Sequence, residues 1–183
     1  MTRPFLEILT RTCKRPTLLA QNVASLACQT DAGWSQSLLV DEVGRGIGWA
    51  SENMAAYAPH LVGHFVWCLD DDDVCVRPTL VAELRRIVAT KHADLIMLRM
   101  DHGPRGILPD DAHWGQAPTR GGIGMSAFVA RRALWQRCAG ALCPGSYESD
   151  YELVAELYRH AKLIYWWDVI ASRVLQIGLG RPE

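Results

Sequence analysis

Four consecutive aspartates, Asp70, Asp71, Asp72 and Asp73, carry the strongest chemical signal in this 183-residue sequence. They directly follow an apolar run at residues 65–69, which reads as a buried strand. Carboxylates gathered at the end of a buried strand need water or a hard cation around them, and Mg²⁺ and Mn²⁺ prefer oxygen ligands of this kind. The run is therefore interpreted either as a divalent-metal site or as a solvated acidic turn that ends the strand.

The composition predicts one globular domain spanning residues 1–183. Hydrophobic residues make up 49% and charged residues 21% of the chain, which is enough apolar material for a sizeable core. The net charge of -1 lacks the basic excess of nucleic-acid-binding proteins. The sequence shows neither a secretory signal nor the apolar stretch of about 20 residues that spans a membrane. We therefore expect a cytoplasmic protein with no nucleic-acid partner and no transmembrane segment.

The elements that must position the aspartates alternate between strand and helix. Apolar runs predict strands at residues 5–12, 37–40, 64–69, 94–100, 124–130 and 163–167, and helical spacing predicts helices at residues 17–29, 49–58, 132–139, 151–160 and after Pro78. This alternation predicts an α/β fold, a three-layer αβα sandwich around a predominantly parallel sheet. Residues 101–122 break the pattern, because Gly, Pro, Asp and His dominate there, and we expect a functional loop.

Polar residues follow the first three predicted strands. Arg11 and Thr12 end the first strand, Asp41 and Glu42 follow the second, and the aspartates follow the third. Ligands of parallel α/β sheets bind beyond the carboxyl ends of the strands. These strand ends therefore predict a nucleotide-binding cleft.

These motifs resemble those of family-2-type glycosyltransferases, which have the Rossmann-like GT-A fold. The stretch Ile-Leu-Thr-Arg-Thr-Cys-Lys-Arg-Pro at residues 8–16 is similar to the family's first strand and helix start, and Leu-Val-Asp at residues 39–41 is similar to its second strand. Gly48, Ala50 and Asn53 resemble the following helix. Residues 65–73 resemble the strand that ends in the family's Asp-x-Asp signature. The resemblance covers about the first ninety residues and implies a nucleotide-diphospho-sugar transferase.

The resemblance implies roles for individual residues of the first half. Asp72 would bind Mn²⁺ or Mg²⁺ directly, and Asp70 would lie near the metal or the ribose. Asp71 takes the variable position, and Asp73 would structure the turn. The metal would neutralise the charge that develops on the β-phosphate as the sugar leaves. The implied nucleotide-binding residues are Arg11, Thr12, Arg15, Asp70 and Asp41, the last of which would accept a hydrogen bond from a uridine base.

The second half supplies a candidate catalytic base. Asp150 and the residues after it resemble the family's acidic segment, in which an aspartate begins a helix beneath the acceptor site. Ser149 and Glu152 fit a capping box, which would place Asp150 in the first helical turn, where the helix dipole favours the ionised form. An ionised aspartate takes the proton from the attacking acceptor hydroxyl in an inverting transfer. Glu148 is the second candidate for this role, and Asp150 could instead only stabilise its helix end.

The loop at residues 101–122 supplies three further candidates. His102 directly follows a predicted strand and is a candidate metal ligand. Trp114 could stack on a sugar, and Arg120, beside two glycines, could pair with a phosphate. The alternative is that these side chains are structural or solvated.

The leading hypothesis is a metal-dependent, inverting glycosyltransferase that uses a nucleotide-diphosphate sugar, uridine-linked by resemblance, and an acceptor hydroxyl. Residues 1–100 would form its nucleotide-binding half and residues 101–183 its acceptor-side half. The alternative is a non-catalytic nucleotide- or sugar-binding module with the same fold. A sugar-phosphate nucleotidyltransferase is less favoured, because the Gly-rich, lysine-containing N-terminal loop of that class is missing.

Overall fold

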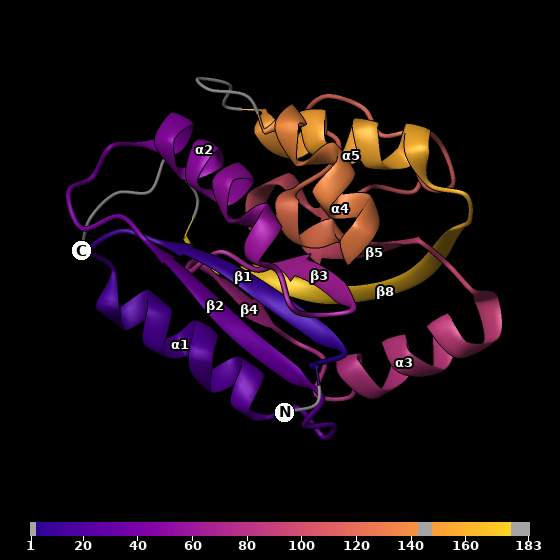
Figure 1. Cartoon of the computed structure of the whole chain (residues 1–183), viewed down its shortest axis with the longest axis horizontal. Helices are drawn as coiled ribbons and strands as arrows, with labels where there is room; N and C mark the ends of the chain where they lie inside the picture. Colours follow the sequence, from indigo (N-terminus) through magenta and orange to yellow (C-terminus); the bar gives the residue numbers. More distant parts are fainter. Residues whose placement is uncertain (1–2, 143–147, 177–183) are drawn as a thin grey trace.

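One sheet of eight strands forms the centre of the protein (Figure 1). The structure is a computed structural model that describes residues 3–142 and 148–176. Its strands are β1 (Leu6–Thr12), β2 (Trp34–Val40), β3 (Phe65–Cys68), β4 (Asp73–Cys75), β5 (Leu95–Asp101), β6 (Ile107–Leu108), β7 (Phe128–Arg131) and β8 (Ile164–Val174). Its α-helices are α1 (Pro16–Ala27), α2 (Ile47–Tyr57), α3 (Leu80–Lys91), α4 (Arg132–Cys138) and α5 (Ser149–His160).

The sheet is mostly parallel, as the alternating pattern predicts. Its strand order is β2-β1-β3-β7-β5-β8-β4, with β6 beside β5. Strands β1, β2 and β3 are parallel to one another, and β5 is parallel to β8. Strand β7 runs antiparallel to both β3 and β5, so β1, β2, β3, β5 and β8 all share one direction. Strands β4 and β6 run against that direction.

Helices cover both faces of the sheet. Figure 1 shows α1 and α3 on one face and α2, α4 and α5 on the other. Each face has its own buried cluster: Leu26 and Leu84, from α1 and α3, belong to one, and Met54 and Leu153, from α2 and α5, belong to the other. The expected three-layer αβα sandwich is therefore confirmed. Among the helices of the described residues, none has the length and apolar character needed to cross a membrane.

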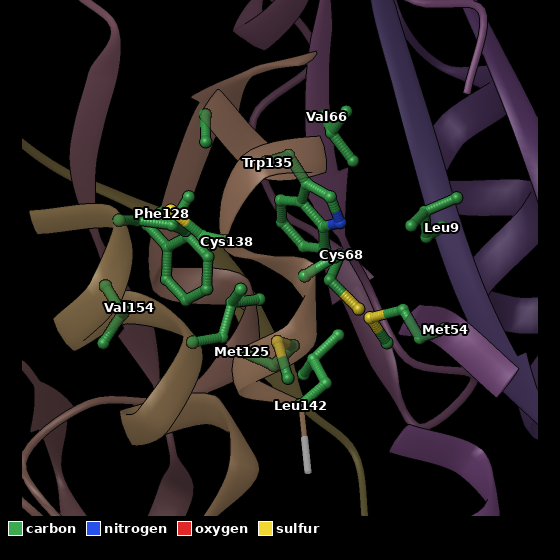
Figure 2. Packing of buried hydrophobic residues seen from close by; sticks show 14 of the residues in the cluster. Leu9, Met54, Val66, Cys68, Met125, Phe128, Trp135, Cys138, Leu142 and Val154 are labelled. Atoms are coloured by element: carbon green, nitrogen blue, oxygen red, sulfur yellow. The ribbon is translucent and has the colours of Figure 1, made fainter. Parts of the chain in front are cut away.

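Strand β3 shows why the run before the aspartates is apolar at every position. Phe65 and Trp67 belong to the cluster under α1 and α3, whereas Val66 and Cys68 belong to the opposite cluster. All four side chains are at most 2% exposed. Figure 2 shows Val66 and Cys68 among the side chains that surround Trp135. Since both faces of this strand are covered, neither face tolerates a polar residue.

Several element boundaries differ from the prediction. Strands β4 and β6 were not predicted, because their three and two residues are too few to show a period of two. Strand β8 runs to Val174, past the predicted end at residue 167, and a register irregularity opposite Arg99 interrupts its pattern. The expected loop at residues 101–122 contains β6 and a 3₁₀ turn, Gly103–Arg105. The predicted strand at residues 124–130 begins with another 3₁₀ turn, Met125–Ala127.

Candidate functional site

A cavity of about 310 Å³ lies at the carboxyl ends of the central strands. Its walls include Arg11 near the end of β1, Asp70 and Asp72 after β3, His102 after β5, and Asp150 in the first turn of α5. This end of an α/β sheet is where such folds bind ligands. The cavity therefore brings together the predicted metal ligands and the predicted base, which come from separate parts of the sequence.

Two arginines hold the carboxylates of the aspartate run. Arg11 forms a bidentate salt bridge with Asp70, in which Nε lies 2.7 Å from Oδ1 and Nη2 lies 2.5 Å from Oδ2. Arg15 donates from Nε to Asp71 Oδ2 at 3.0 Å and from Nη1 to Asp72 Oδ2 at 2.9 Å. Guanidinium groups suit this role, because their planar donors match the geometry of carboxylates. The acidic run is therefore neither a freely solvated turn nor uncompensated charge.

A buried asparagine holds the backbone of the same turn. Asn22, on α1, is fully buried, and its Nδ2 lies 2.9 Å from the carbonyl oxygens of both Asp70 and Asp73. Its Oδ1 accepts a hydrogen bond of 2.7 Å from Gln36 on β2. Asp73 begins β4, which pairs with β8 opposite Val174. Helix α1 and strand β8 thus hold this turn, and Asp73 has the structural position expected for it.

Burial and mutual repulsion raise the pKa values of the remaining aspartates. Burial, followed by the charge of Asp70, raises the pKa of Asp72 to about 6, although Arg15 opposes this shift. Burial also raises the pKa of Asp71, and it raises the pKa of Asp73 well above its ordinary value. Negative charge is therefore costly at this turn, and an added cation would stabilise it.

The donor set fits a divalent metal that is shared with phosphates. Asp70 and Asp72 both line the cavity and offer carboxylate oxygens, the ligands that Mg²⁺ and Mn²⁺ prefer. In the described residues, no group of three or more His, Cys, Asp or Glu side chains is arranged to enclose a metal by itself. Mg²⁺ sites of this open kind take one or two protein carboxylates and complete the coordination with phosphates and water.

The pKa of Asp150 lies above the ordinary value of an aspartate. Burial raises its pKa to about 6, and the hydrogen bond from the Tyr151 backbone N–H and the positive charge of Arg11 only partly oppose this shift. The N–H of Tyr151 lies 2.7 Å from Asp150 Oδ1. Asp150 lies in the first turn of α5, as predicted, but burial makes its ionised form less favourable than in a solvated carboxylate.

The predicted capping box does not form. Helix α5 begins at Ser149 itself, and Glu148 precedes it without a capping hydrogen bond from its side chain. The Ser149 hydroxyl instead accepts a hydrogen bond of 2.9 Å from Ser51 on α2, because both hydroxyls are buried there. This contact joins the start of α5 to α2 beside the cavity.

Arg120 ties the loop to the start of α5. Its guanidinium pairs with both Glu148 and Glu152 and lies 4.7 Å from the ring centre of Tyr151. Glu148 also lines the cavity, whereas Arg120 and Glu152 are not among its lining residues in the described part of the chain. The structure therefore places Arg120 against acidic side chains of α5, and the carboxylate of Glu148 already has a cationic partner.

Of the other two loop candidates, His102 lies at the cavity and Trp114 lies against Trp166 and Arg99. His102 lines the cavity, and its Nδ1 is buried without a hydrogen-bond partner in the described structure. Burial lowers the pKa of His102, which favours the neutral imidazole. The ring centre of Trp114 lies 4.8 Å from that of Trp166, with the two rings edge to face, and 4.3 Å from the guanidinium carbon of Arg99. Trp114 is not among the described residues that line the cavity.

The carboxylate of Asp41 is hydrogen-bonded by the loop that follows it. Its carboxylate accepts hydrogen bonds from the backbone N–H groups of Val43, Gly44 and Arg45, at 3.1, 2.9 and 2.5 Å. Burial alone would raise its pKa, but these hydrogen bonds outweigh burial and lower it. Within the described residues, Asp41 does not line the cavity, and neither do Thr12 and Arg15.

Arg105 and Gln176 are polar residues of the cavity wall that were not predicted individually. Arg105 belongs to the loop that was expected to be functional, so the composition of that loop was the signal available for it. Gln176 follows the unpredicted extension of β8, and nothing in its sequence context marks it.

Comparison with known proteins identifies the fold. No protein-family profile and no curated protein sequence matches this chain. Solved structures do match: S. aureus TarS residues 1–349 has a TM-score of 0.69 and 14% identity, over 92% of this chain and 60% of that one. The same protein with UDP-GlcNAc gives a TM-score of 0.66, 15% identity and coverages of 94% and 59%.

A second protein of known structure points to the same fold. The mannosyltransferase PcManGT from Pyrobaculum calidifontis, in complex with GDP-Man and Mn²⁺, has a TM-score of 0.63 and 13% identity, over 93% of this chain and 58% of that one. The chain thus spans about three fifths of these neighbours. These similarities show that it has the GT-A-type fold of glycosyltransferases, and they confirm the expected fold.

Proposed function

We propose that this chain is a glycosyltransferase that moves a sugar from a nucleotide-diphosphate donor, of which a uridine-linked sugar is the favoured kind, to an acceptor hydroxyl. The observation that carries the proposal is the single cavity that holds Asp70, Asp72 and Asp150 together. Two carboxylates for a donor-bound metal and one for a base are the groups that an inverting transfer needs.

The structural neighbours support the same donor class. TarS structures contain UDP or UDP-GlcNAc, and PcManGT contains GDP-Man with Mn²⁺. The GT-A-type fold of this chain places Asp70 and Asp72 at the carboxyl ends of its strands, where a nucleotide donor would bind. We propose that residues 1–100 supply most donor contacts and that residues 101–183 supply the acceptor side.

In the proposed mechanism the three cavity carboxylates Asp70, Asp72 and Asp150 divide the chemical roles. Asp70 and Asp72 would hold Mn²⁺ or Mg²⁺, which supplies positive charge for the leaving diphosphate. Asp150 would accept the proton of the acceptor hydroxyl as its oxygen attacks the anomeric carbon, and the configuration at that carbon inverts. Asp150 is favoured over Glu148 because Arg120 already pairs with Glu148. A pKa near 6 leaves Asp150 mostly ionised at neutral pH and still basic enough to take a proton.

Calorimetric titration tests the donor site. UDP is titrated into the protein with Mn²⁺ and with EDTA, and GDP serves as the competing nucleotide. We expect Mn²⁺ to strengthen UDP binding and Asp72→Ala to remove that gain. Asp31→Ala is the matched control, because Asp31 pairs with Arg85 away from the cavity. If neither nucleotide binds in the presence of Mn²⁺, the proposed function is wrong.

A non-catalytic binding module remains the second candidate function. The observation in its favour is that Arg11 and Arg15 already pair with three of the carboxylates, so part of the negative charge is compensated without a metal. Incubation with UDP-sugars and simple hydroxyl acceptors, followed by product analysis, separates the two. Released UDP with a glycosylated product supports the transferase, and transfer of a nucleotide would indicate a nucleotidyltransferase instead.

A further inference from the structure

The first turn of α5, which carries Asp150, is held by contacts from outside the helix. Glu148 precedes the helix, and in the described structure its side chain does not cap it. The backbone groups at a helix end have no helical partners, so an uncapped end frays unless other contacts hold it. One such contact is the buried hydroxyl pair of Ser149 and Ser51. The place of Asp150 in the cavity therefore depends on tertiary contacts of this turn.

Arg120 supplies the second contact. Its Nη1 and Nη2 donate to Glu148 and Glu152, and its guanidinium carbon lies 4.7 Å from the ring centre of Tyr151. The two glutamates stand two residues before and two residues after Asp150. A guanidinium presents several donors in one plane and also binds aromatic faces, so a single arginine can make all three contacts. Arg120 therefore bridges the chain on both sides of the proposed base.

Arg120 is itself held by a tight turn. The N–H of Gly122 donates to the carbonyl of Thr119 at 3.0 Å, which places Arg120 and Gly121 at the centre of the turn. Gly121 has a φ of 70°, in the left-handed region that glycine adopts without strain. Arg105, which lines the cavity, donates to the carbonyl of Gly121 at 2.5 Å. These contacts connect the cavity wall to Arg120 and, through it, to the first turn of α5.

The contacts of Arg120 favour an effect on geometry over one on stability. Among the described residues, Arg120 does not line the cavity, so it reaches the site through Glu148 and Glu152. Arg120 is exposed and both glutamates are partly exposed, and ion pairs of this kind add little to the free energy of unfolding. A displacement of about 1 Å in a catalytic group, by contrast, can slow a reaction by about 10²-fold.

We propose that Arg120 is a positioning residue for Asp150. By holding Glu148 and Glu152, it fixes the first turn of α5 and with it the direction in which the Asp150 carboxylate meets the acceptor hydroxyl. This inference rests on the proposed function. Its consequence is that Arg120 determines the rate of transfer and not the affinity for the donor.

Amide hydrogen exchange, followed by NMR, tests the positioning without any substrate. In Arg120→Ala we expect the amides of Glu152 and Leu153 to exchange about three- to thirtyfold faster, the range for the loss of two exposed ion pairs. Arg159→Ala is the matched control, because Arg159 forms a comparable exposed pair with Glu156 near the other end of the same helix. This control should leave the exchange of both amides unchanged, and the two variants should have similar urea midpoints.

Release of UDP from UDP-GlcNAc at saturating Mn²⁺, with water as the acceptor, tests the effect on the reaction. In Arg120→Ala we expect kcat to fall by about ten- to a hundredfold and KM to stay within about twofold. Arg120→Lys keeps the charge but lacks the planar fork, so its kcat should lie between those of Arg120→Ala and the unmodified protein. In a Glu152→Gln background, Arg120→Ala should cause a smaller loss than it causes alone, because both changes break one contact.

Three results would overturn the inference. It is wrong if exchange in the first turn of α5 is the same in Arg120→Ala as in the unmodified protein, or if Arg120→Ala raises KM and leaves kcat intact. It is also wrong if the losses from Arg120→Ala and Glu152→Gln simply multiply, because Arg120 would then act directly on a ligand. If the unmodified protein does not bind UDP even with Mn²⁺, the proposed function fails, and the exchange measurement still decides whether Arg120 holds this turn.

Discussion

Asp41 and Asp150 show how the surroundings of a carboxylate decide its chemistry. Asp41 is buried and Asp150 is half-buried, but Asp41 accepts three backbone hydrogen bonds and its pKa falls. Asp150 accepts one such bond, from Tyr151, and burial raises its pKa to about 6. A base works best when its pKa lies near the operating pH, so only Asp150 is suited to proton transfer. The sequence marks both residues, but it does not reveal which backbone N–H groups surround each carboxylate.

Replacing Asp150 separates catalysis from donor binding. Asp150→Asn keeps the shape of the side chain and removes the proton acceptor, so we expect transfer to fall by roughly 10²- to 10⁴-fold. UDP affinity with Mn²⁺ should change little, because the proposed donor residues come from other elements. Glu156→Gln, on the same helix but paired with Arg159, is the control and should transfer normally. Full transfer by Asp150→Asn, with transfer lost in Glu148→Gln, would reverse the assignment of the base.

The pKa of Asp150 predicts an acidic limb in the rate profile. Because burial raises this pKa from 3.8 to about 6, the carboxylate is protonated below that pH and ionised above it. We expect kcat/KM to fall about tenfold per pH unit below pH 6 and to level off above it. The profile is measured at saturating Mn²⁺, which keeps the metal-binding carboxylates ionised. A midpoint near pH 4 would mean that Asp150 is solvated or is not the base.

At the level of elements, helix α1 was predicted from its apolar spacing, yet the side chain by which it holds the aspartate turn is polar. Val23, an apolar residue of this helix, is 41% exposed, whereas Asn22 is fully buried. Asn22 is buried because it meets the carbonyls of Asp70 and Asp73, about fifty residues away along the chain. Periodicity places polar residues in solvent and contains no information about such distant partners. The short strand β4 was missed for a related reason, since pairing with β8 defines it.

Removing the Asn22 amide should loosen the aspartate turn. Asn22→Ala removes the hydrogen bonds to the carbonyls of Asp70 and Asp73 and the one from Gln36, so we expect the free energy of unfolding to fall by about 1–3 kcal/mol. Urea denaturation measures this change, and Mn²⁺ titration should show weaker metal binding. Gln21→Ala, at an exposed position of the same helix, should cost less than about 0.5 kcal/mol. Equal stability and metal affinity in both variants would contradict the role given to Asn22.

For the whole molecule, the alternation of strands and helices predicted the three-layer αβα architecture. It did not predict the order of the strands in the sheet. Strand β7 separates β3 from β5 by antiparallel pairing, and this arrangement depends on contacts between distant segments. The same limit applies to the site. The motifs marked Asp72 and Asp150 separately, and a single sequence contains no measurement that brings them to one cavity. The resemblance to glycosyltransferases supplied that expectation.

The two core clusters predict cooperative unfolding of one domain. Leu84 and Leu153 are fully buried on opposite faces of the sheet, and β3 contributes side chains to both clusters. Leu84→Ala and Leu153→Ala should each lower the free energy of unfolding by about 2–5 kcal/mol. In both variants, tryptophan fluorescence and far-UV circular dichroism should report one shared urea midpoint. Two separate midpoints would mean that the faces unfold independently and that residues 1–183 do not form one unit.

Paramagnetic broadening tests most directly whether a donor-bound metal at Asp72 lies in the same cavity as Asp150, as we propose. The amide NMR spectrum of the UDP-saturated protein is recorded with Mg²⁺ and then with a small amount of Mn²⁺. We predict that amides of Arg11, Asp72 and Asp150 broaden most, whereas those of α3, on the other face of the sheet, remain sharp. Broadening that leaves either Asp72 or Asp150 unaffected, or that centres on another part of the molecule, would contradict the proposed active site.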